Sequence, residues 1–384
     1  WTATDKIAHH LRNQYSSNRL WRTRGTLREC RRILLWQEAL WEGRMFGVAF
    51  WKVAGRQSGQ QVASWKVLEP SCDLATVVDP SKIPFPDRLL LPYQRYTSVL
   101  SSKDFETTMV TSRGCPHKCT YCFNHKYNQI YKEQAGDKKV LFSRTPESIV
   151  EEILWLRKTE VVKMVNFVDD VFTIDKKWTL RFAEIYARDC GIPFTINARF
   201  DHFDEDIVAA LAKANLSMVY AGIESGNEHM RNVIMEREQS LEDIYKTAEL
   251  FRKYKIKVLT ENVLGGPGET FDMAMETLMV NTKVKPVVAN ASIFAPYPGM
   301  KMTQIAIDKG YFDGDYDRID TTYYASSVLK FDNPKDENKI YNLRCFFSLL
   351  TQHPWLIPFI KPLLSINNKK AFWLIGTFLD GYYI

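Results

Sequence analysis

Three cysteines lie close together in the chain, at Cys115, Cys119 and Cys122. Because the gaps between them are short, the three thiolates could converge on one metal centre without a long loop. Structural zinc sites normally close with four ligands, and iron–sulfur clusters usually take four cysteines. The remaining cysteines, at positions 30, 72, 190 and 345, lie elsewhere in the sequence. We therefore predict a 4Fe–4S cluster with one iron open to a small molecule, and keep structural or zinc-binding thiols as the alternative.

Polar residues and glycines stand where predicted strands end. Residues 167–173 contain Asp169 and Asp170, residues 197–200 contain Arg199, and residues 220–227 contain Glu224 and Ser225. A carboxylate can hold an ammonium group, and a guanidinium can hold a carboxylate. For each motif a purely structural role is the alternative: an aspartate that caps a helix, an arginine in an ion pair, or a tight turn.

The elements that must position these residues alternate between about residues 105 and 300. Strands are expected at residues 107–112, 164–168, 194–198, 218–223, 258–264 and 288–294. Helices are expected from residue 145 onward and at residues 178–189, 204–214, 241–254 and 270–280. Repeated β-α units imply parallel strands with right-handed crossovers. The fold class is therefore α/β, and its chemistry should collect at the carboxyl ends of the strands.

The charge of the chain is uneven. Its net charge is +6. Residues 1–60 hold 11 Lys and Arg against 4 Asp and Glu, so the other residues sum to −1. A basic groove for a phosphate backbone is not implied, and no nucleic-acid partner is expected. Seven cysteines without paired spacing suit a reduced cytoplasm rather than a disulfide scaffold.

The cysteine segment and the strand-end motifs resemble those of the radical S-adenosylmethionine (SAM) enzymes, whose signature has the form C-x3-C-x-aromatic-C. The resemblance implies a partial, open (β/α)6 barrel of TIM-like type. It also implies two cofactors, a 4Fe–4S cluster and SAM. The cluster's free iron holds the methionine end of SAM, and an electron cleaves the sulfonium. The product is a 5′-deoxyadenosyl radical, which takes hydrogen from a small-molecule substrate.

The resemblance implies roles for the motifs nearest the cysteines. Tyr121, inside the cysteine segment, packs against SAM. The pair Asp169 and Asp170 stands where the family binds the methionine amine, and which of the two faces the ligand is left open. Arg199 pairs with a carboxylate of SAM or with that of Glu224.

The later motifs carry the rest of the SAM site by the same resemblance. Glu224 and Ser225 bind ribose hydroxyls or the methionine carboxylate, and Arg237 reaches that carboxylate. Val263 forms an apolar wall beside adenine. Residues 294–299 line the substrate cavity.

The domain organisation resembles the cobalamin-binding radical SAM family. Residues 81–104 form a proline-rich linker, residues 105–300 the radical SAM core and residues 301–384 a helical extension. Residues 1–80 stand at the position of the cobalamin domain as a remnant or divergent segment. They contain no Asp-x-His-x-x-Gly motif. We therefore expect this chain to bind cobalamin weakly or not at all, whereas the complete protein would use it.

The predicted function is that of a radical SAM enzyme which carries out cobalamin-assisted methylation, rearrangement or cyclisation. The alternatives are a cobalamin-independent enzyme of methylthiotransferase or maturase type, and a non-enzymatic metal-binding scaffold. A reducing partner such as flavodoxin or ferredoxin is expected. The apolar stretches 353–364 and 372–378 are too short to span a bilayer. They are interpreted as core-packing helices, with peripheral membrane contact as the alternative.

Overall fold

The computed structural model describes residues 50–57, 60–67, 84–86, 106–135, 141–159, 161–320 and 326–383. The chain divides into two units, Trp1–Glu69 and Pro70–Ile384. In the first unit, β1 (Phe50–Gln57) and β2 (Gln60–Val67) form an antiparallel hairpin. The predictions for residues 1–49, and most of the predicted linker, lie outside the described residues.

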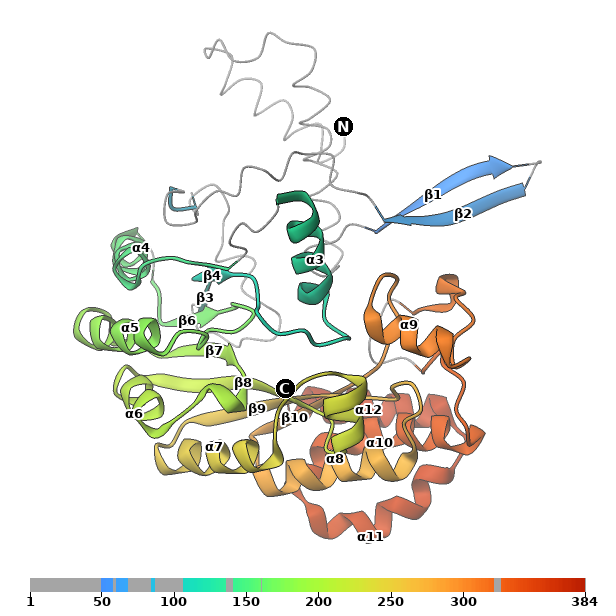
Figure 1. Cartoon of the computed structure of the whole chain (residues 1–384). Coiled ribbons are helices and arrows are strands. Elements are labelled where there is room, and N and C mark those ends of the chain that lie inside the picture. Colours follow the sequence, from blue (N-terminus) through green and yellow to red (C-terminus); the bar gives the residue numbers. More distant parts are fainter. Residues whose placement is uncertain are drawn as a thin grey trace, which may run out of the picture. The chain divides into compact units, whose positions relative to one another are not determined.

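A six-stranded parallel sheet forms the centre of the second unit (Figure 1). Its strands, in spatial order, are β10 (Val288–Ile293), β9 (Lys257–Leu264), β8 (Leu216–Glu224), β7 (Phe194–Ala198), β6 (Met164–Phe167) and β3 (Glu106–Met109). Every neighbouring pair is parallel. Among the described strands, β3 and β10 are the two edges of the sheet, so it is open. The predicted parallel direction of the strands is confirmed.

The first predicted strand is the one that differs most from expectation. It was expected to run over residues 107–112, but β3 ends at Met109, and Ser112–Arg113 form a separate short strand, β4. β4 pairs antiparallel with β5 (Phe142–Ser143). The chain leaves the parallel sheet here because the N–H groups of residues 111 and 112 donate to the side chain of Asp169 instead of to a neighbouring strand.

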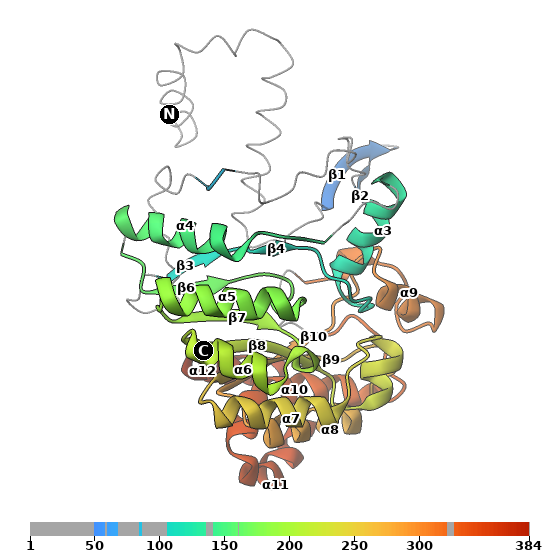
Figure 2. The ribbon, with the colours of Figure 1, turned by 60° about the vertical axis from the view of Figure 1, so that its left-hand side comes forward.

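The helices between the strands cover the sheet. They are α4 (Pro146–Thr159), α5 (Lys176–Asp189), α6 (Glu205–Lys213), α7 (Leu241–Lys253) and α8 (Phe271–Val284). Each packs on the next, and Figure 2 shows α4 to α7 following one another along the sheet. Their starts are local: Asp175, Asp204, Ser240 and Thr270 each accept a hydrogen bond from a backbone N–H three residues ahead.

The interior between α5 and the sheet is largely aromatic. The ring centroids of Phe167 and Phe182 lie 5.5 Å apart, and those of Tyr186 and Phe194 lie 4.8 Å apart. All four side chains are fully buried. This packing holds the carboxyl ends of β6 and β7 in place. The predicted motifs at residues 167–173 and 197–200 begin at these two strand ends.

Helices also stand outside the alternating units. They are α3 (Phe123–Ala135), α9 (Lys301–Asp308), α10 (Pro334–Gln352), α11 (Ile357–Ile360) and α12 (Lys369–Tyr383). The helical extension is therefore confirmed, and α10 packs against α8, β10 and α12. Among the residues that the structure describes, no helix is both long enough and apolar enough to cross a membrane. The core-packing interpretation is wrong for much of α12, because Trp373 and Phe378 are exposed.

Candidate active site

The three predicted cysteines lie on the loop between β4 and α3. Cys115 and Cys119 are buried, Cys122 is partly exposed, and all three are free thiols. The loop is tied to distant segments through one residue. The N–H of Thr120 donates to the carbonyl of Met235 at 3.0 Å, and the carbonyl of Thr120 accepts from Met302 at 3.0 Å.

The thiols lie close enough for their charges to interact. Burial raises the pKa of Cys115 to about 12 and that of Cys122 to about 11, and the charges of the neighbouring cysteines add to both increases. In the described part of the chain, no three His, Cys, Asp or Glu side chains are close enough to hold a metal ion as they stand. Three thiols on one loop nevertheless fit the donor set of an iron–sulfur cluster, because a bound cation offsets the cost of ionising a buried thiol.

Asp169 fastens the chain just before this loop. Its carboxylate accepts from the N–H of Thr111 at 3.0 Å, from the hydroxyls of Thr111 and Ser112 at 2.8 and 2.6 Å, and from the N–H of Ser112. These donors occupy the group, which is buried, so the predicted ligand role of Asp169 is not supported. Asp170 is exposed, and its charge acts on Cys115 and Cys122. Of the two aspartates, Asp170 is therefore the one whose carboxylate is exposed to solvent.

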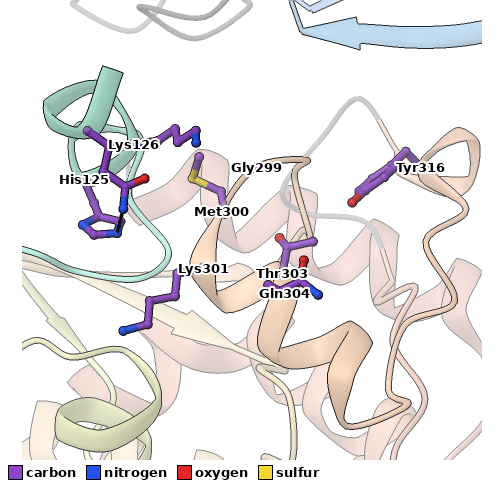
Figure 3. A pocket seen from close by; sticks show the side chains of 9 residues that line it. His125, Lys126, Gly299, Met300, Lys301, Thr303, Gln304 and Tyr316 are labelled. Carbon is purple, nitrogen blue, oxygen red and sulfur yellow. Dashed lines mark hydrogen bonds between the residues drawn. The ribbon is translucent and has the colours of Figure 1, made fainter. Parts of the chain in front are cut away.

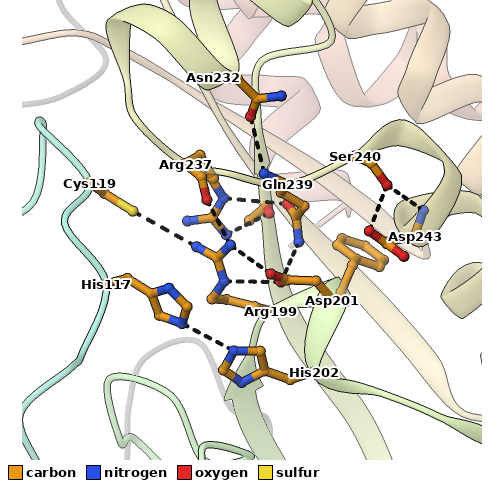
Figure 4. A network of polar contacts seen from close by, with 12 residues as sticks. His117, Cys119, Arg199, Asp201, His202, Asn232, Arg237, Gln239, Ser240 and Asp243 are labelled. Carbon is orange, nitrogen blue, oxygen red and sulfur yellow. Dashed lines mark hydrogen bonds and ion pairs between the residues drawn. The ribbon is translucent and has the colours of Figure 1, made fainter.

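Arg199 follows β7 and reaches the cysteine loop (Figure 4). Its guanidinium holds both oxygens of Asp201 at 2.8 and 3.0 Å and donates to the carbonyl of Arg237 at 2.7 Å. One of its nitrogens lies 3.9 Å from the sulfur of Cys119. The predicted pairing of Arg199 with Glu224 is therefore wrong. Asp201 lies two residues away and matches the planar guanidinium with both oxygens.

Arg237 is the actual partner of Glu224. The two are 3.3 Å apart, Nη1 to Oε1, and the same nitrogen donates to the hydroxyl of Tyr121 at 2.7 Å. Burial lowers the pKa of Arg237 because it disfavours the charged guanidinium. The electrostatic interactions with Tyr121 and Glu224 together are larger, so the net effect is a raised pKa for Arg237. Space for this group depends on Gly222, since a Cβ there would lie 1.9 Å from Oε1 of Glu224. The structure thus brings Tyr121, Glu224 and Arg237 together at the carboxyl end of β8.

Ser225 is directed elsewhere. Its hydroxyl is fully buried, lies 3.5 Å from the hydroxyl of Thr277 in α8 and accepts from the N–H of Asn227. The predicted ligand role of this hydroxyl is not supported by its position. Val263, near the end of β9, and Tyr121 pack against the same cluster of buried apolar side chains.

A histidine pair beside the loop was not singled out from the sequence. Nε2 of His117 lies 3.0 Å from Nε2 of His202, and the rings are tilted with centroids 5.1 Å apart. Burial, followed by the charge of Arg199, lowers the pKa of His117 to about 4, and burial lowers that of His202. Two neutral rings can share one hydrogen bond, so the pair ties the cysteine loop to the turn after β7. The only sequence signal was the position of His117 between two of the cysteines.

A cavity of about 310 Å³ opens between α3 and α9 (Figure 3). It is lined by His125, Lys126, Gln129, Gly299, Met300, Lys301, Thr303, Gln304 and Tyr316. Its first wall begins three residues after Cys122, and its second follows β10. Burial, followed by the charge of Lys301, lowers the pKa of His125. The cationic groups that line the cavity are therefore Lys126 and Lys301. Sequence reasoning expected only residues 294–299 near a cavity and missed the lysines.

A parallel α/β sheet with a cysteine loop beyond the ends of its strands defines the class of protein. Residues 109–279 match the model of the radical SAM superfamily. The superfamily is one of enzymes that use a 4Fe–4S cluster and SAM.

Three relatives illustrate the likeness. An uncharacterized methyltransferase of Pyrococcus horikoshii is 30% identical over 243 residues, covering 62% of this chain and 49% of the relative. An anaerobic magnesium-protoporphyrin IX monomethyl ester cyclase of Rubrivivax gelatinosus is 26% identical, covering 58% and 39%. A tRNA-2-methylthio-N(6)-dimethylallyladenosine synthase of Thermus thermophilus is 29% identical, covering 49% and 40%. The chain therefore spans less than half the length of each of these relatives.

Proposed function

We propose that this chain holds a 4Fe–4S cluster on Cys115, Cys119 and Cys122 and binds SAM beside it at the carboxyl edge of the sheet. When bound, the cluster and SAM supply a 5′-deoxyadenosyl radical, which takes hydrogen from an organic substrate. The observation that carries the proposal is the position of the three free thiols inside the matched domain, next to the group formed by Tyr121, Glu224 and Arg237.

The residues around the loop divide the binding of SAM among them. Asp170 accepts from the methionine ammonium, because its carboxylate is exposed beside the cysteines. Arg237 offers its cation to the methionine carboxylate, and Glu224 accepts from a ribose hydroxyl. Tyr121 and Val263 supply the apolar wall that packs against the adenine and excludes water.

The substrate enters the cavity between α3 and α9. Lys126 and Lys301 line it, and Glu236 balances one of these charges through an ion pair of 2.5 Å with Lys301. An excess of cations favours a substrate with an anionic group such as a carboxylate.

The reaction that follows hydrogen removal is methylation, rearrangement or cyclisation assisted by cobalamin in the complete protein. The names of the methyltransferase and cyclase relatives support this choice. A cobalamin-independent enzyme is the second candidate, and the relative that acts as a methylthio synthase favours it. A reducing partner such as flavodoxin or ferredoxin supplies the electron in either case.

Anaerobic reconstitution tests the proposal. The chain should bind about four irons, the content of one cluster, and with dithionite and SAM it should release 5′-deoxyadenosine. Cys119→Ser should lose both, whereas Cys190→Ser should keep both, because Cys190 lies at the end of α5 outside the loop. Stoichiometric zinc without iron–sulfur absorption would favour the scaffold alternative and refute the enzyme.

A cobalamin titration tests the finer assignment. Residues 1–384 should bind cobalamin weakly or not at all, and a longer form of the protein should bind it tightly. If deoxyadenosine forms but no form of the protein binds cobalamin, the cobalamin-independent candidate is correct.

A further inference from the structure

The outward face of α12 is apolar and largely exposed. Leu374, Phe378 and Tyr382 are 62%, 74% and 75% exposed, and Trp373 is 53% exposed. Large apolar side chains that lie singly on a surface are ordinary, but a continuous row on one helix marks an interaction site.

The opposite face of the same helix accounts for its packing. Phe372 is buried, a Cβ on Gly376 would lie 3.1 Å from the sulfur of Cys345, and Asp380 forms an ion pair of 2.6 Å with Arg344. These three residues recur every four positions, so they share one face, which lies against α10. The exposed row also recurs every four positions but is offset by two residues, which places it on the far side. The helix is therefore held by one face and presents apolar side chains on the other.

The segment before α12 continues this character. Trp355 and Phe359 are 67% and 69% exposed. The side-chain amide of Asn342 in α10 donates to the carbonyls of Leu364 and Ile366 at 2.9 Å each, so the segment is attached to the same helix as α12. Trp355 and Phe359 are thus exposed on a segment whose backbone is hydrogen-bonded to α10.

The charges of this region indicate what it meets. Residues 353–383 contain Lys361, Lys369 and Lys370 and a single acid, Asp380, which already pairs with Arg344. Lys369 pairs with Glu337 at 2.8 Å, so the excess positive charge of this region comes from Lys361 and Lys370. Lysines beside exposed tryptophan, tyrosine and leucine are typical of segments that lie in a membrane interface, where anionic lipids attract the lysines. With 15 residues, α12 is about 22 Å long, too short to span a hydrocarbon core. It suits a position parallel to the surface.

We propose that the outward face of α12 docks on the surface of a lipid bilayer that contains anionic lipids. Leu374, Phe378 and Tyr382 enter the boundary between headgroups and acyl chains, and Lys361 and Lys370 contact lipid phosphates. The docking surface is independent of the chemistry proposed for the cysteine loop.

Flotation of the full chain with vesicles tests the proposal. The chain should float with vesicles of phosphatidylcholine and phosphatidylglycerol and much less with phosphatidylcholine alone. The double variant Leu374→Ser/Phe378→Ser should bind at least roughly tenfold more weakly, because two exposed apolar side chains no longer enter the bilayer. The matched control is Val161→Ser/Met279→Ser, whose parent side chains are 55% and 45% exposed and lie outside α12, and it should bind like the parent.

Three results would overturn the proposal. The first is no flotation with either kind of vesicle. The second is an equal loss of binding in the α12 variant and in the control. The third is a dimer in sedimentation experiments without lipid that Leu374→Ser/Phe378→Ser abolishes, together with no vesicle binding, which would identify a second copy of the chain as the occupant. Unchanged thermal unfolding of the variants shows that loss of binding is not loss of fold.

Discussion

The sulfur of Cys119 lies 3.9 Å from Nη1 of Arg199, so the cysteine loop meets a fixed cation at the end of β7. The guanidinium cannot move away, because Asp201 holds it with two oxygens and the carbonyl of Arg237 accepts its remaining bond. One buried arginine thus connects the cysteine loop, the turn after β7 and the segment that carries Arg237.

Replacing Arg199 should cost stability as well as cluster binding. Arg199→Gln leaves the carboxylate of Asp201, whose side chain is only 21% exposed, without its cation. We expect the free energy of unfolding in urea to fall by about 2–3 kcal/mol. The double variant with Asp201→Asn should recover part of this loss, because the uncompensated charge is removed. Equal stability of Arg199→Gln and the parent would show that the ion pair contributes nothing.

Substitutions of the adjacent Asp169 and Asp170 should have different effects on stability, iron content and SAM binding. Asp169→Asn removes a carboxylate that accepts bonds from Thr111 and Ser112, and should lower the free energy of unfolding by about 2 kcal/mol and reduce iron loading. Asp170→Asn should leave stability and iron unchanged and weaken SAM binding in calorimetry, since its side chain is exposed. The opposite pattern would assign the ligand role to Asp169.

Gly222→Ala should weaken SAM binding without touching any proposed ligand. The added Cβ would lie 1.9 Å from Oε1 of Glu224 and 2.9 Å from Nη2 of Arg237, so the ion pair must move. We expect SAM affinity to fall about tenfold or more, the loss of roughly one hydrogen bond to a charged group. Iron–sulfur absorption should be unchanged, because Cys115, Cys119 and Cys122 are on another loop. Parent-like affinity would exclude this pair from the SAM site.

In the turn after β8, replacing Gly226 by alanine should destabilise the protein more than a glycine-to-alanine change where the added methyl group meets no neighbour. A Cβ there would lie 2.5 Å from the carbonyl oxygen of Glu276 and 2.6 Å from Cα of Thr277, both in the backbone of α8. Gly226→Ala should therefore lower the free energy of unfolding by about 1–3 kcal/mol. The matched control is Gly381→Ala in α12, which meets no atom within 4 Å and should be neutral or stabilising by up to about 1 kcal/mol. Similar effects at both sites would contradict close packing of the turn on α8.

The stability of the domain should fall between about pH 4.5 and pH 7 through Glu269. Burial raises the pKa of this carboxyl from its ordinary value to about 7, although the N–H groups of Gly265 and Gly266 donate to it. The folded chain then binds a proton that the unfolded chain has released, so stability is greatest at low pH and is lost as pH rises toward 7. The loss should be about 3 kcal/mol, from about 1.4 kcal/mol per pH unit.

Glu269→Gln provides the control for this titration. The amide oxygen can still accept from Gly265 and Gly266 but carries no charge at any pH. The free energy of unfolding of the variant should decline less than that of the parent over the same range. Parallel curves would assign the decline to other groups, of which Glu261, with a pKa raised by burial to about 7, is the first to examine.

The sequence by itself determined the local features of this protein. Five strands lie within two residues of the predicted bounds, because buried apolar runs between turn signals have few other conformations. Helix starts at Asp204 and Thr270 follow from side chains that bond to N–H groups three residues ahead. The spacing of Cys115, Cys119 and Cys122 predicted an iron–sulfur cluster, with zinc-binding or structural thiols as the alternative, and the ligand role of these cysteines stays a prediction.

Only the tertiary structure decided how side chains from distant segments pair. Asp169 and Asp170 are adjacent in sequence, yet one is enclosed by residues 57 and 58 positions earlier and the other is left exposed. Glu224 turns toward Arg237 because its backbone adopts a left-handed conformation, with φ of 63°, beside a glycine that leaves room for it. Such pairings depend on the direction in which each strand end projects its side chains. In the same way, the exposed face of α12 depends on which of its faces packs against α10. The spacing of residues along a single segment determines neither the direction of a side chain nor the packed face of a helix.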